Sequence, residues 1–590
     1  MNQQQANKQM VSRLLFRLLP VQICLAAVGA VNGTVSGLFA SNFVGMEAMS
    51  AIGLYAPFGM LIGAFYTMLA GGSVILCGKY LGRNERLKIQ HVFSLNLLLS
   101  ALISALFILV FFLMLLFGAA RTLTEDAAVR TVFNRYLLGQ IIGVFPTILG
   151  NQLPAFLSLE NKGKRALQAS LVFIGVNILL NALFVGLLRM DAFGLSLAGS
   201  LGMWVFLLVE AWPFINGKAD LRIAFQALDW KESGEVLKIG FPGAVGSGYQ
   251  TLRGLIVNRL ITLFVGSVGI SAFTASDSIL RLFWAIPGGM LAVSRLLISV
   301  SVGEEDRQTL TDVMRNMFTR FIPLMCAVSA VLILLADPFT RLFYRDPASP
   351  VFQMTVMGFR ILPLCMPLSV ICMHFVCYAQ VSNKQFLVHL LSAADGVVFV
   401  AGFTALLIRA LGMNSVYIAN VLNGVMVLLA ILAYAIIKKR RFPRNMEDLM
   451  VIPEDFGVSE TERLDLTLKT MDDVIEVSRR VQMFCLERGI DERRAYLSGL
   501  ALEEMAGNVI AHGFSKDKKK HTVDVRVVHK GNDVILRIKD DCVTFDPAER
   551  QRTADPNDIS KNVGIRMIYK IATEVQHQNL LGLNVLTIRI

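Results

Sequence analysis

Residues 43–51 read FVGMEAMSA and residues 264–272 read FVGSVGISA, so one motif recurs 221 positions further along the chain. Two other pairs share this offset: residues 82–86 (GRNER) with 303–307 (GEEDR), and Pro146 with Pro367. Three matches in one register indicate an internal duplication. When an even number of membrane spans separates such copies, both halves enter the bilayer from the same side and a cleft lies between them, as in many transporters.

The composition predicts that this duplication lies in a membrane. The chain of 590 residues is 54% hydrophobic and 17% charged, and its mean hydropathy of +0.57 is too high for a soluble protein. About twelve apolar stretches each approach the roughly 20 residues that cross a bilayer core. They lie near residues 18–42, 51–78, 92–118, 134–158, 166–188, 193–215, 239–265, 271–300, 316–336, 352–379, 386–408 and 414–437.

We therefore expect an all-α polytopic membrane protein of two six-helix lobes, residues 14–220 and 221–440, after a short polar head at residues 1–13. The net charge is +12, but Lys and Arg are spread over alternate interhelical loops, whereas the loops around Glu47 and residues 266–269 have none. The positive-inside rule then predicts a multi-pass cell-membrane protein with both termini in the cytoplasm. Because the basic residues form no single patch, we expect no nucleic-acid partner.

The membrane part resembles a known family. The resemblance rests on the duplicated plan and on motifs at residues 35–39 (VSGLF), 43–45 (FVG), Pro57 and 78–84 (GKYLGRN). These are similar to the N-terminal lobe of the multidrug and toxic compound extrusion (MATE) transporters, and the likeness spans about residues 14–440. It implies a secondary-active antiporter that exports a small, drug-like molecule in exchange for sodium ions or protons. Many relatives carry an aspartate where this chain has Ser36, which argues against proton coupling at that position.

Polar and ionisable residues inside spans are costly unless they are paired or face water, so they mark candidate sites. The candidates for the transport cleft are Asn32, Ser36, Arg253, Asp277, Arg281 and Asp395, with Glu210 towards the end of the sixth span. Asp277 and Arg281 are four residues apart, so they share a helix face as either a structural ion pair or a gate. Asp395 is either a coupling or substrate carboxylate or the acceptor of an interhelical hydrogen bond. The arginines of the second lobe leave open an anionic or zwitterionic substrate, including a lipid.

After residues 438–441 (KKRR) the composition changes, and a linker at residues 441–454 leads to a soluble α+β domain at residues 455–590. The periodicity predicts strands and helices in a fixed order. The strands cover residues 463–470, 522–528, 534–539, 574–577 and 585–590, the helices 472–488, 491–513 and 563–572, and a mobile lid residues 546–561. A layer of helices on one mixed or antiparallel sheet is the expected packing.

One helix of this domain carries the most informative motif. Residues 500–512 read LALEEMAGNVIAH, so Glu504, Asn508 and His512 lie at steps of four along one stripe. There a carboxylate, an amide and an imidazole can converge on a metal-bound phosphate chain. The neighbouring stripe from Leu497 to Val509 is apolar and can be buried.

The order of these elements resembles the GHKL (histidine-kinase-like) ATPase fold, a sandwich of helices on a sheet that includes the anti-sigma-factor serine kinases. The resemblance implies a catalytic or water-orienting role for Glu504, a magnesium-holding role for Asn508, adenine recognition by Asp540, and close approach of the phosphates to the backbone at Gly564. It thus implies ATP and Mg²⁺ as cofactors. The family places two glycines where this chain has Cys542 and Thr544, and side chains there crowd the nucleotide or alter the backbone. A nucleotide-free protein-interaction module is therefore the alternative.

The eight cysteines form no Cys-x-x-Cys pair. Six of them lie in or beside apolar spans, where cysteine is an ordinary packing residue. We therefore assign no metal or disulfide to them from the sequence.

Two functional classes remain. The first is a secondary-active transporter of a small molecule with a cytoplasmic nucleotide-binding or regulatory tail. The second is a membrane-anchored signalling protein whose tail is a serine kinase or a module that sequesters a cytoplasmic protein partner. The sequence leaves open whether the tail is an enzyme, and it names neither the substrate nor the coupling ion.

Overall fold

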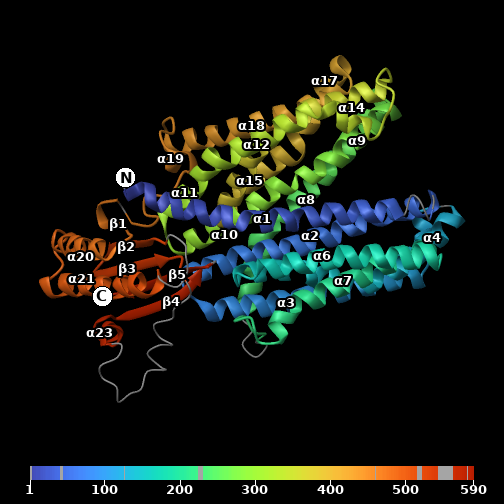
Figure 1. Cartoon of the computed structure of the whole chain (residues 1–590). Helices are drawn as coiled ribbons and strands as arrows, with labels where there is room; N and C mark the ends of the chain where they lie inside the picture. The colour runs from blue at the N-terminus through green and yellow to red at the C-terminus, as the bar shows by residue number, and fades with distance from the viewer. Residues whose placement is uncertain are drawn as a thin grey trace. The chain divides into compact units, whose positions relative to one another are not determined.

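The computed structural model describes residues 3–39, 44, 46–124, 126–223, 230–458, 460–514, 521–542, 563–580 and 582–590. The chain divides into two compact units. Unit 2 contains residues 15–303 and 313–452, and unit 1 contains residues 1–14, 304–312 and 453–590. Figure 1 shows the helices of unit 2 and the small sheet of unit 1.

Unit 2 is built from helices, two of which begin in unit 1, at residues 3–14 and 307–312 (Figure 1). The first half of the chain contributes α1 (Gln3–Phe39), α2 (Met46–Gly82), α3 (Arg86–Leu116), η2 (Ala119–Thr122), α4 (Ala127–Gly150), α5 (Leu153–Leu159), α6 (Gly163–Asn181), η3 (Ala182–Leu187) and α7 (Asp191–Ile215). The second half contributes α8 (Trp230–Phe264), α9 (Ser267–Phe283), α10 (Ala285–Gly303), α11 (Arg307–Asn316), η5 (Met317–Phe321), α12 (Ile322–Leu334), α13 (Ala336–Arg341), α14 (Pro350–Ile361), η6 (Leu362–Leu364), α15 (Cys365–Val381), α16 (Gln385–Ala393), η7 (Ala394–Val398), α17 (Phe399–Leu411), α18 (Asn414–Lys439) and α19 (Met446–Met450). The prediction of an all-α membrane part is confirmed.

Ten helical segments among the described residues are long and apolar enough to cross a membrane. The two further predicted spans, residues 18–42 and 239–265, fall largely on α1 and α8, which are not among the ten. In α8 the stretch carries Gln250, Arg253 and Arg259, so it is more polar than the other spans. Part of the α1 span lies outside the described residues.

Helices α2 and α8 come from the two halves of the chain and touch backbone to backbone. A Cβ built on Gly72 would lie 2.0 Å from the carbonyl oxygen of Val236, and one built on Gly240 would lie 1.9 Å from the carbonyl oxygen of Met68. Only glycine fits at both positions, and small residues of this kind are what membrane helices use to approach closely. The two halves of unit 2 are therefore in direct backbone contact at Gly72 and Gly240.

Unit 1 contains a five-stranded sheet that is antiparallel throughout, in the order β1-β2-β3-β5-β4. Its elements are η8 (Glu460–Glu462), β1 (Arg463–Leu468), α20 (Met471–Leu486), α21 (Glu492–Asn508), η9 (Val509–Gly513), β2 (Val523–Lys530), β3 (Asp533–Asp540), α23 (Val563–Ile571), β4 (Glu574–Leu580) and β5 (Leu583–Arg589). The predicted strands and helices are confirmed, and the sheet is antiparallel rather than mixed. The predicted lid at residues 546–561 lies outside the described residues.

Local sequence explains these elements. Thr470 and Asp473 form a capping box at the start of α20, which satisfies two free backbone N–H groups. Gly531, with φ +66°, makes the tight turn between β2 and β3 possible, since glycine adopts positive φ without strain. Alternate residues of the two strands, such as Val525 and Leu536, are buried in one core with the helices.

The opposite face of the sheet is basic and carries an acidic segment of unit 1. The side chain of Glu304 is 1% exposed and lies 3.0 Å from Nζ of Lys539. Asp306, equally buried, pairs with Arg526 and lies 3.8 Å from Lys539. Burial alone would raise the pKa of Asp306, but Arg526 and Lys539 hold that pKa below its usual range. The third acid, Glu305, forms an exposed pair with Lys530.

Candidate functional site

Two of the motifs predicted for nucleotide binding, one with Glu504 and the other with Gly564, lie next to each other in unit 1. Gly564 lies near the start of α23, and a Cβ built there would lie 1.7 Å from Oε1 of Glu504 on α21. A side chain at position 564 would therefore collide with the carboxylate. Only glycine therefore allows the start of α23 to approach Glu504 this closely.

Asn508 follows Glu504 by one turn and is the last residue of α21. Residues 509–513 continue as the π-helical turn η9, whose wider winding changes the angular step between residues. His512 in this turn is exposed, whereas Glu504 and Asn508 are half-buried. Glu504 and Asn508 thus lie one turn apart on α21 and His512 lies in η9, while the convergence of these groups on one ligand stays a prediction.

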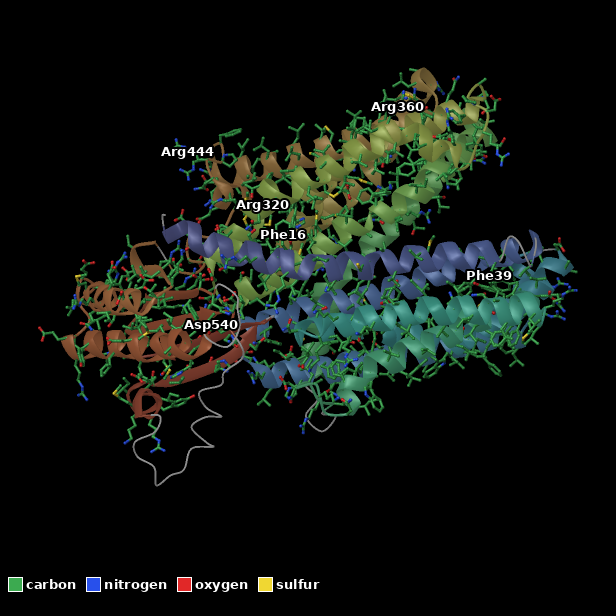
Figure 2. The ribbon with its side chains drawn as sticks, in the orientation of Figure 1. Phe16, Phe39, Arg320, Arg360, Arg444 and Asp540 are labelled. Atoms are coloured by element: carbon green, nitrogen blue, oxygen red, sulfur yellow. The ribbon has the colours of Figure 1, made fainter. Side chains whose placement is uncertain are left out.

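Asp540 ends β3 and is 5% exposed (Figure 2). Its Oδ1 accepts hydrogen bonds from Nδ2 of Asn584 at 2.8 Å and from the backbone N–H of Cys542 at 3.0 Å. Burial raises the pKa of Asp540, and these hydrogen bonds oppose that rise. The carboxylate is thus held in place by two neutral donors.

Sequence reasoning missed Asn584. It is directly opposite Asp540 in the pairing of β3 with β5, and its Nδ2 also donates to the carbonyl oxygen of Cys542 at 3.2 Å. Only the register of the two strands brings these residues together, and no local motif signals it.

In the first glycine motif, Cys542 stands where the related family has a glycine. Cys542 is buried, and its Sγ lies 3.1 Å from where a Cβ of Gly513 would be. The thiol therefore packs against the turn that follows α21. Thr544 lies outside the described residues.

Unit 2 contains a cavity of about 1440 Å³ between its two halves. It is lined by residues 53–68 of α2, residues 241–258 of α8 and Arg281 of α9. Most of the lining is apolar or glycine, with polar groups from Tyr66, Thr67, Ser247, Gln250, Thr251 and Asn258. Arg281 is the one charged side chain among the described residues that line it.

Of the predicted cleft residues, Arg281 and Asp277 form an ion pair of 2.6 Å on α9. Arg281 lines the cavity, whereas Asp277, Arg253 and Asp395 are not among the described residues that do so. The side chains of Asn32 and Ser36 lie outside the described residues.

Asp395 sits in the π-helical turn η7, and its Oδ1 accepts a hydrogen bond of 2.8 Å from Nδ2 of Asn423 on α18. A Cβ on Gly396 would lie 2.6 Å from Cβ of Tyr249, so this turn also packs closely on α8. The structure therefore gives Asp395 the interhelical hydrogen bond that the sequence left as one of two alternatives. Glu210 on α7 is fully buried, and both of its carboxylate oxygens lack a hydrogen-bond partner among the described residues.

Comparison with known proteins agrees with both units. The MatE family model matches residues 25–183 and 242–398, and a model of the histidine kinase-like ATPase domain matches residues 468–590. The probable multidrug resistance protein NorM of Bacillus licheniformis is 23% identical over 305 residues, which cover 50% of this chain. The match spans 64% of that protein, less than two thirds of its length.

Solved structures show the same fold for the membrane part. An outward-facing multidrug resistance MATE family transporter of the MOP superfamily is 20% identical with a TM-score of 0.66, covering 71% of this chain and 94% of its own. A MATE structure in the bent conformation is 20% identical with a TM-score of 0.65, covering 73% and 96%. A MOP superfamily transporter of Pyrococcus furiosus is also 20% identical with a TM-score of 0.64, covering 71% and 95%. The chain is therefore a multi-pass membrane protein that belongs to the MatE family and carries a histidine kinase-like ATPase domain at its C-terminal end.

Proposed function

We propose that the protein is a secondary-active exporter of a small amphipathic molecule and that its tail binds ATP. The cavity between the two halves of unit 2 carries the first part of the proposal, because a substrate that alternates between two sides must bind between the moving halves. The relative from Bacillus licheniformis, whose name describes multidrug resistance, supports the same activity. A pure membrane anchor needs no such cavity, so the signalling alternative is not favoured.

The lining of the cavity indicates the substrate class. A large apolar wall binds a hydrophobic body, and a few polar groups fix its orientation. Arg281 supplies the one positive charge among the described lining residues, partly neutralised by Asp277. An apolar molecule with an anionic or zwitterionic group fits this lining better than a dication does.

Binding of candidate substrates to the purified chain tests this assignment. Arg281→Gln should weaken binding of an anionic amphiphile by about ten- to a hundredfold, the loss of one charge-assisted hydrogen bond of roughly 1.5–3 kcal/mol, and should leave a neutral analogue unchanged. Arg259→Gln is the matched control, since Arg259 is exposed on α8 and does not line the cavity. Equal affinities of the Arg281→Gln chain and the wild type for the anion would contradict the proposed polarity.

The tail is proposed to bind ATP with Mg²⁺ through Glu504, Asn508, Asp540 and Gly564. The contact of Gly564 with Glu504 and the buried, neutral-donor environment of Asp540 support this proposal. Asn508 would hold the metal from the end of α21, where its amide oxygen is a hard ligand suited to Mg²⁺. Hydrolysis or phosphotransfer would need Glu504 to orient the attacking nucleophile.

Calorimetry on the full-length protein with MgATP tests the nucleotide site. Asp540→Ala should weaken binding by about ten- to a hundredfold, since it removes a charge-assisted hydrogen bond to the adenine. Asn508→Ala should instead reduce the dependence on magnesium. Asp533→Ala, at the opposite end of β3, should bind as the wild type does. Absence of heat from the wild type at millimolar MgATP would leave the tail as a docking domain for a cytoplasmic protein.

Both ends of the chain are proposed to lie in the cytoplasm, where the tail meets ATP. The chain passes between the units after residue 14, at both ends of the 304–312 segment and after residue 452. Of these passages, the linker at residues 441–454 and the 304–312 segment are proposed to transmit the state of the tail. A cysteine introduced at Arg444 should react with an impermeant thiol reagent only after the cells are permeabilised. Labelling from outside intact cells would refute the topology. Sodium ions and protons remain the two coupling ions to compare in transport assays.

A further inference from the structure

The end of the β2–β3 pair carries three metal-ligating side chains that the nucleotide site does not use. Val523 is paired with Asp540, so continuing the antiparallel register places His521 directly opposite Cys542. Asp541 lies between Asp540 and Cys542 in the chain. The sheet therefore brings an imidazole, a carboxylate and a thiol to one point, although 20 residues separate the histidine from the aspartate.

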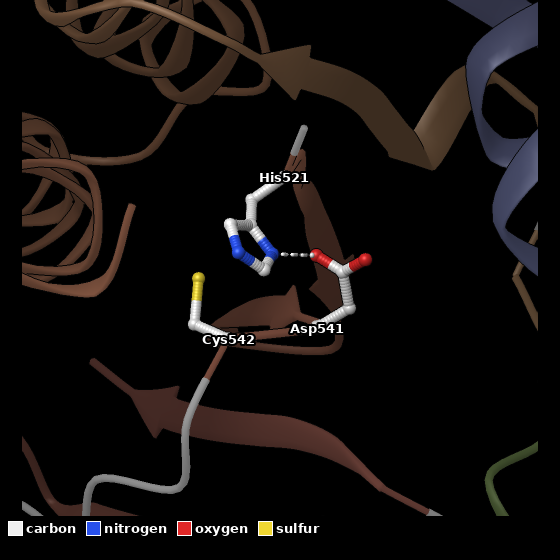
Figure 3. Close-up of side chains that lie close together, drawn as sticks. All are labelled: His521, Asp541 and Cys542. Carbon is white, nitrogen blue, oxygen red and sulfur yellow. Dashed lines mark hydrogen bonds and ion pairs between the residues drawn. The ribbon is translucent and has the colours of Figure 1, made fainter. Parts of the chain in front are cut away.

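Figure 3 shows the three side chains facing one another, with the imidazole between the carboxylate and the sulfur. Nδ1 of His521 lies 2.9 Å from Oδ1 of Asp541. One donor atom from each residue, including Sγ of Cys542, lies within 4.8 Å of the other two. In a tetrahedral zinc site the bond lengths of about 2.0–2.3 Å place ligand atoms roughly 3.3–3.7 Å apart. An ion therefore requires the His521–Asp541 hydrogen bond to open and the more distant donor atoms to approach by about 1 Å.

Contacts outside the cluster position His521 and Cys542. Cys542 is 8% exposed and His521 is 7% exposed. The backbone of Cys542 is fixed by Asp540 and Asn584, through the hydrogen bonds described above. The ring of His521 packs on Phe514, with a centroid separation of 5.6 Å. Second contacts of this kind orient metal ligands and are part of a built site.

We propose that His521, Asp541 and Cys542 bind one thiophilic divalent cation, with Zn²⁺ the best fit. A thiolate, a neutral imidazole and a carboxylate form a ligand set that selects zinc over magnesium or calcium. Binding releases the thiol proton of Cys542, and the two negative ligands then balance the charge of the ion. Three protein ligands leave a fourth position for water or an incoming group.

The proposed metal site gives Cys542 a role at a position where the related family has a glycine. The resemblance places a glycine at position 542, where this chain has a metal-ligating side chain two residues after Asp540. A bound ion fixes the backbone of this segment through Cys542, which glycine has no means to do. The proposal stands without the nucleotide, because none of the three ligands is among the proposed ATP contacts.

Zinc titration of the full-length protein, freed of metal and without nucleotide, tests the proposal. A chromophoric chelator competes for the ion, and Co²⁺ serves as a second probe because a Co²⁺–thiolate bond gives a charge-transfer band. We expect one equivalent of tightly bound zinc and a thiolate band with Co²⁺. His521→Ala and Cys542→Ser should each weaken zinc binding by more than about tenfold and Cys542→Ser should abolish the band, since even outer contacts of a metal site are worth about 10–100-fold.

The chain offers matched controls in the same domain. His529→Ala and Cys485→Ser change a histidine and a cysteine that lie outside the cluster, so both should bind zinc as the wild type does. Asp541→Asn is a milder variant that keeps the side-chain size should Cys542→Ser fail to fold, and it should also weaken binding. Unchanged zinc affinity in Asp541→Asn and His521→Ala, or no thiolate band in the wild type, would overturn the proposal and leave the cluster as a His–Asp hydrogen bond beside a packed thiol.

Discussion

At the scale of single residues, the buried carboxylate of Asp524 lowers the stability of unit 1 when it is charged. Burial raises the pKa of Asp524 from 3.8 to about 6, which the Thr467 hydrogen bond and the cations Lys539 and Arg526 only partly offset. Between these two values the folded chain holds a proton that the unfolded chain has lost. Stability therefore falls as the pH rises from about 4 to 6, and the full penalty, up to about 3 kcal/mol, applies above pH 6.

Asp524→Asn should accordingly raise the thermal stability of unit 1 at pH 7.5 and have little effect near pH 4, because an amide keeps the acceptor for Thr467 without the buried charge. Differential scanning calorimetry at the two pH values measures the effect. Asp533→Asn, near the exposed end of β3, is the control and should change little at either pH. An Asp524→Asn chain that is less stable than the wild type at pH 7.5 would show that the charge of Asp524 is used by its cationic neighbours.

The sequence could predict residues only where a motif is local. Glu504, Asn508, Asp540 and Gly564 lie in short stretches that resemble a known pattern, and the structure brings Glu504 and Gly564 together. By contrast, strand register across the sheet decides that Asn584 lies opposite Asp540 and that His521 lies opposite Cys542. No spacing along the chain reveals them, because a shift of one residue in the register would exchange their faces.

At the scale of elements, the acidic residues 304–306 of unit 1 form ion pairs with the basic face of its sheet, and these pairs differ in how deeply they are buried. Asp306 and Glu304 are almost fully buried against Arg526 and Lys539, whereas Glu305 and Lys530 are about half exposed. Removing one partner of a buried pair leaves an uncompensated charge, which costs about 3–5 kcal/mol. An exposed pair contributes about 0–1 kcal/mol.

Asp306→Ala should therefore lower the unfolding free energy of unit 1 several times more than Glu305→Ala does. The two variants differ by one position, so they are matched in sequence context. Chemical unfolding of the full-length protein, followed by a probe in the 453–590 region, gives both values. Equal, small losses would mean that the acids of this segment do not bind the sheet in solution.

The contact between α2 and α8 leads to a prediction about transport. Gly240 has no room for a Cβ, whereas a Cβ on Gly243, less than one turn away, meets nothing within 4 Å. Gly240→Ala should prevent the two helices from closing here and reduce transport at least about tenfold, while Gly243→Ala should transport normally. Uptake into proteoliposomes measures both. Normal transport by the Gly240→Ala chain would show that this contact is not part of the working cycle.

Elements were predictable where the apolar pattern was regular. The strands and helices of unit 1 follow alternation and helical periodicity closely, because one face of each is buried in a single core. Within the membrane part, α8 departs from the simple pattern since polar residues such as Gln250 line a cavity rather than meeting lipid. The π-helical turns at residues 394–398 and 509–513 were not predicted, because single π-helical turns are rare and the apolar periodicity of the sequence does not signal them.

At the scale of the whole molecule, the 221-residue duplication predicts the division of the membrane part into two related halves, and the family match covers a segment in each half. The duplication cannot predict the substrate, since that depends on which side chains reach the cavity. The structure shows that Arg281 reaches it and that Arg253 and Asp395 are not among the described lining residues.

Counterflow in proteoliposomes tests most directly whether this chain is a transporter. Vesicles that contain the purified protein are loaded with an unlabelled amphipathic substrate and diluted into a trace of the labelled one. An alternating-access carrier exchanges the two, so we predict transient accumulation of label that is lost in the Gly240→Ala chain and kept in the Gly243→Ala chain. A wild-type protein that binds the substrate but shows no accumulation of label would contradict the claim that the chain is a transporter. The membrane part would then be a receptor that binds a ligand and signals through the tail.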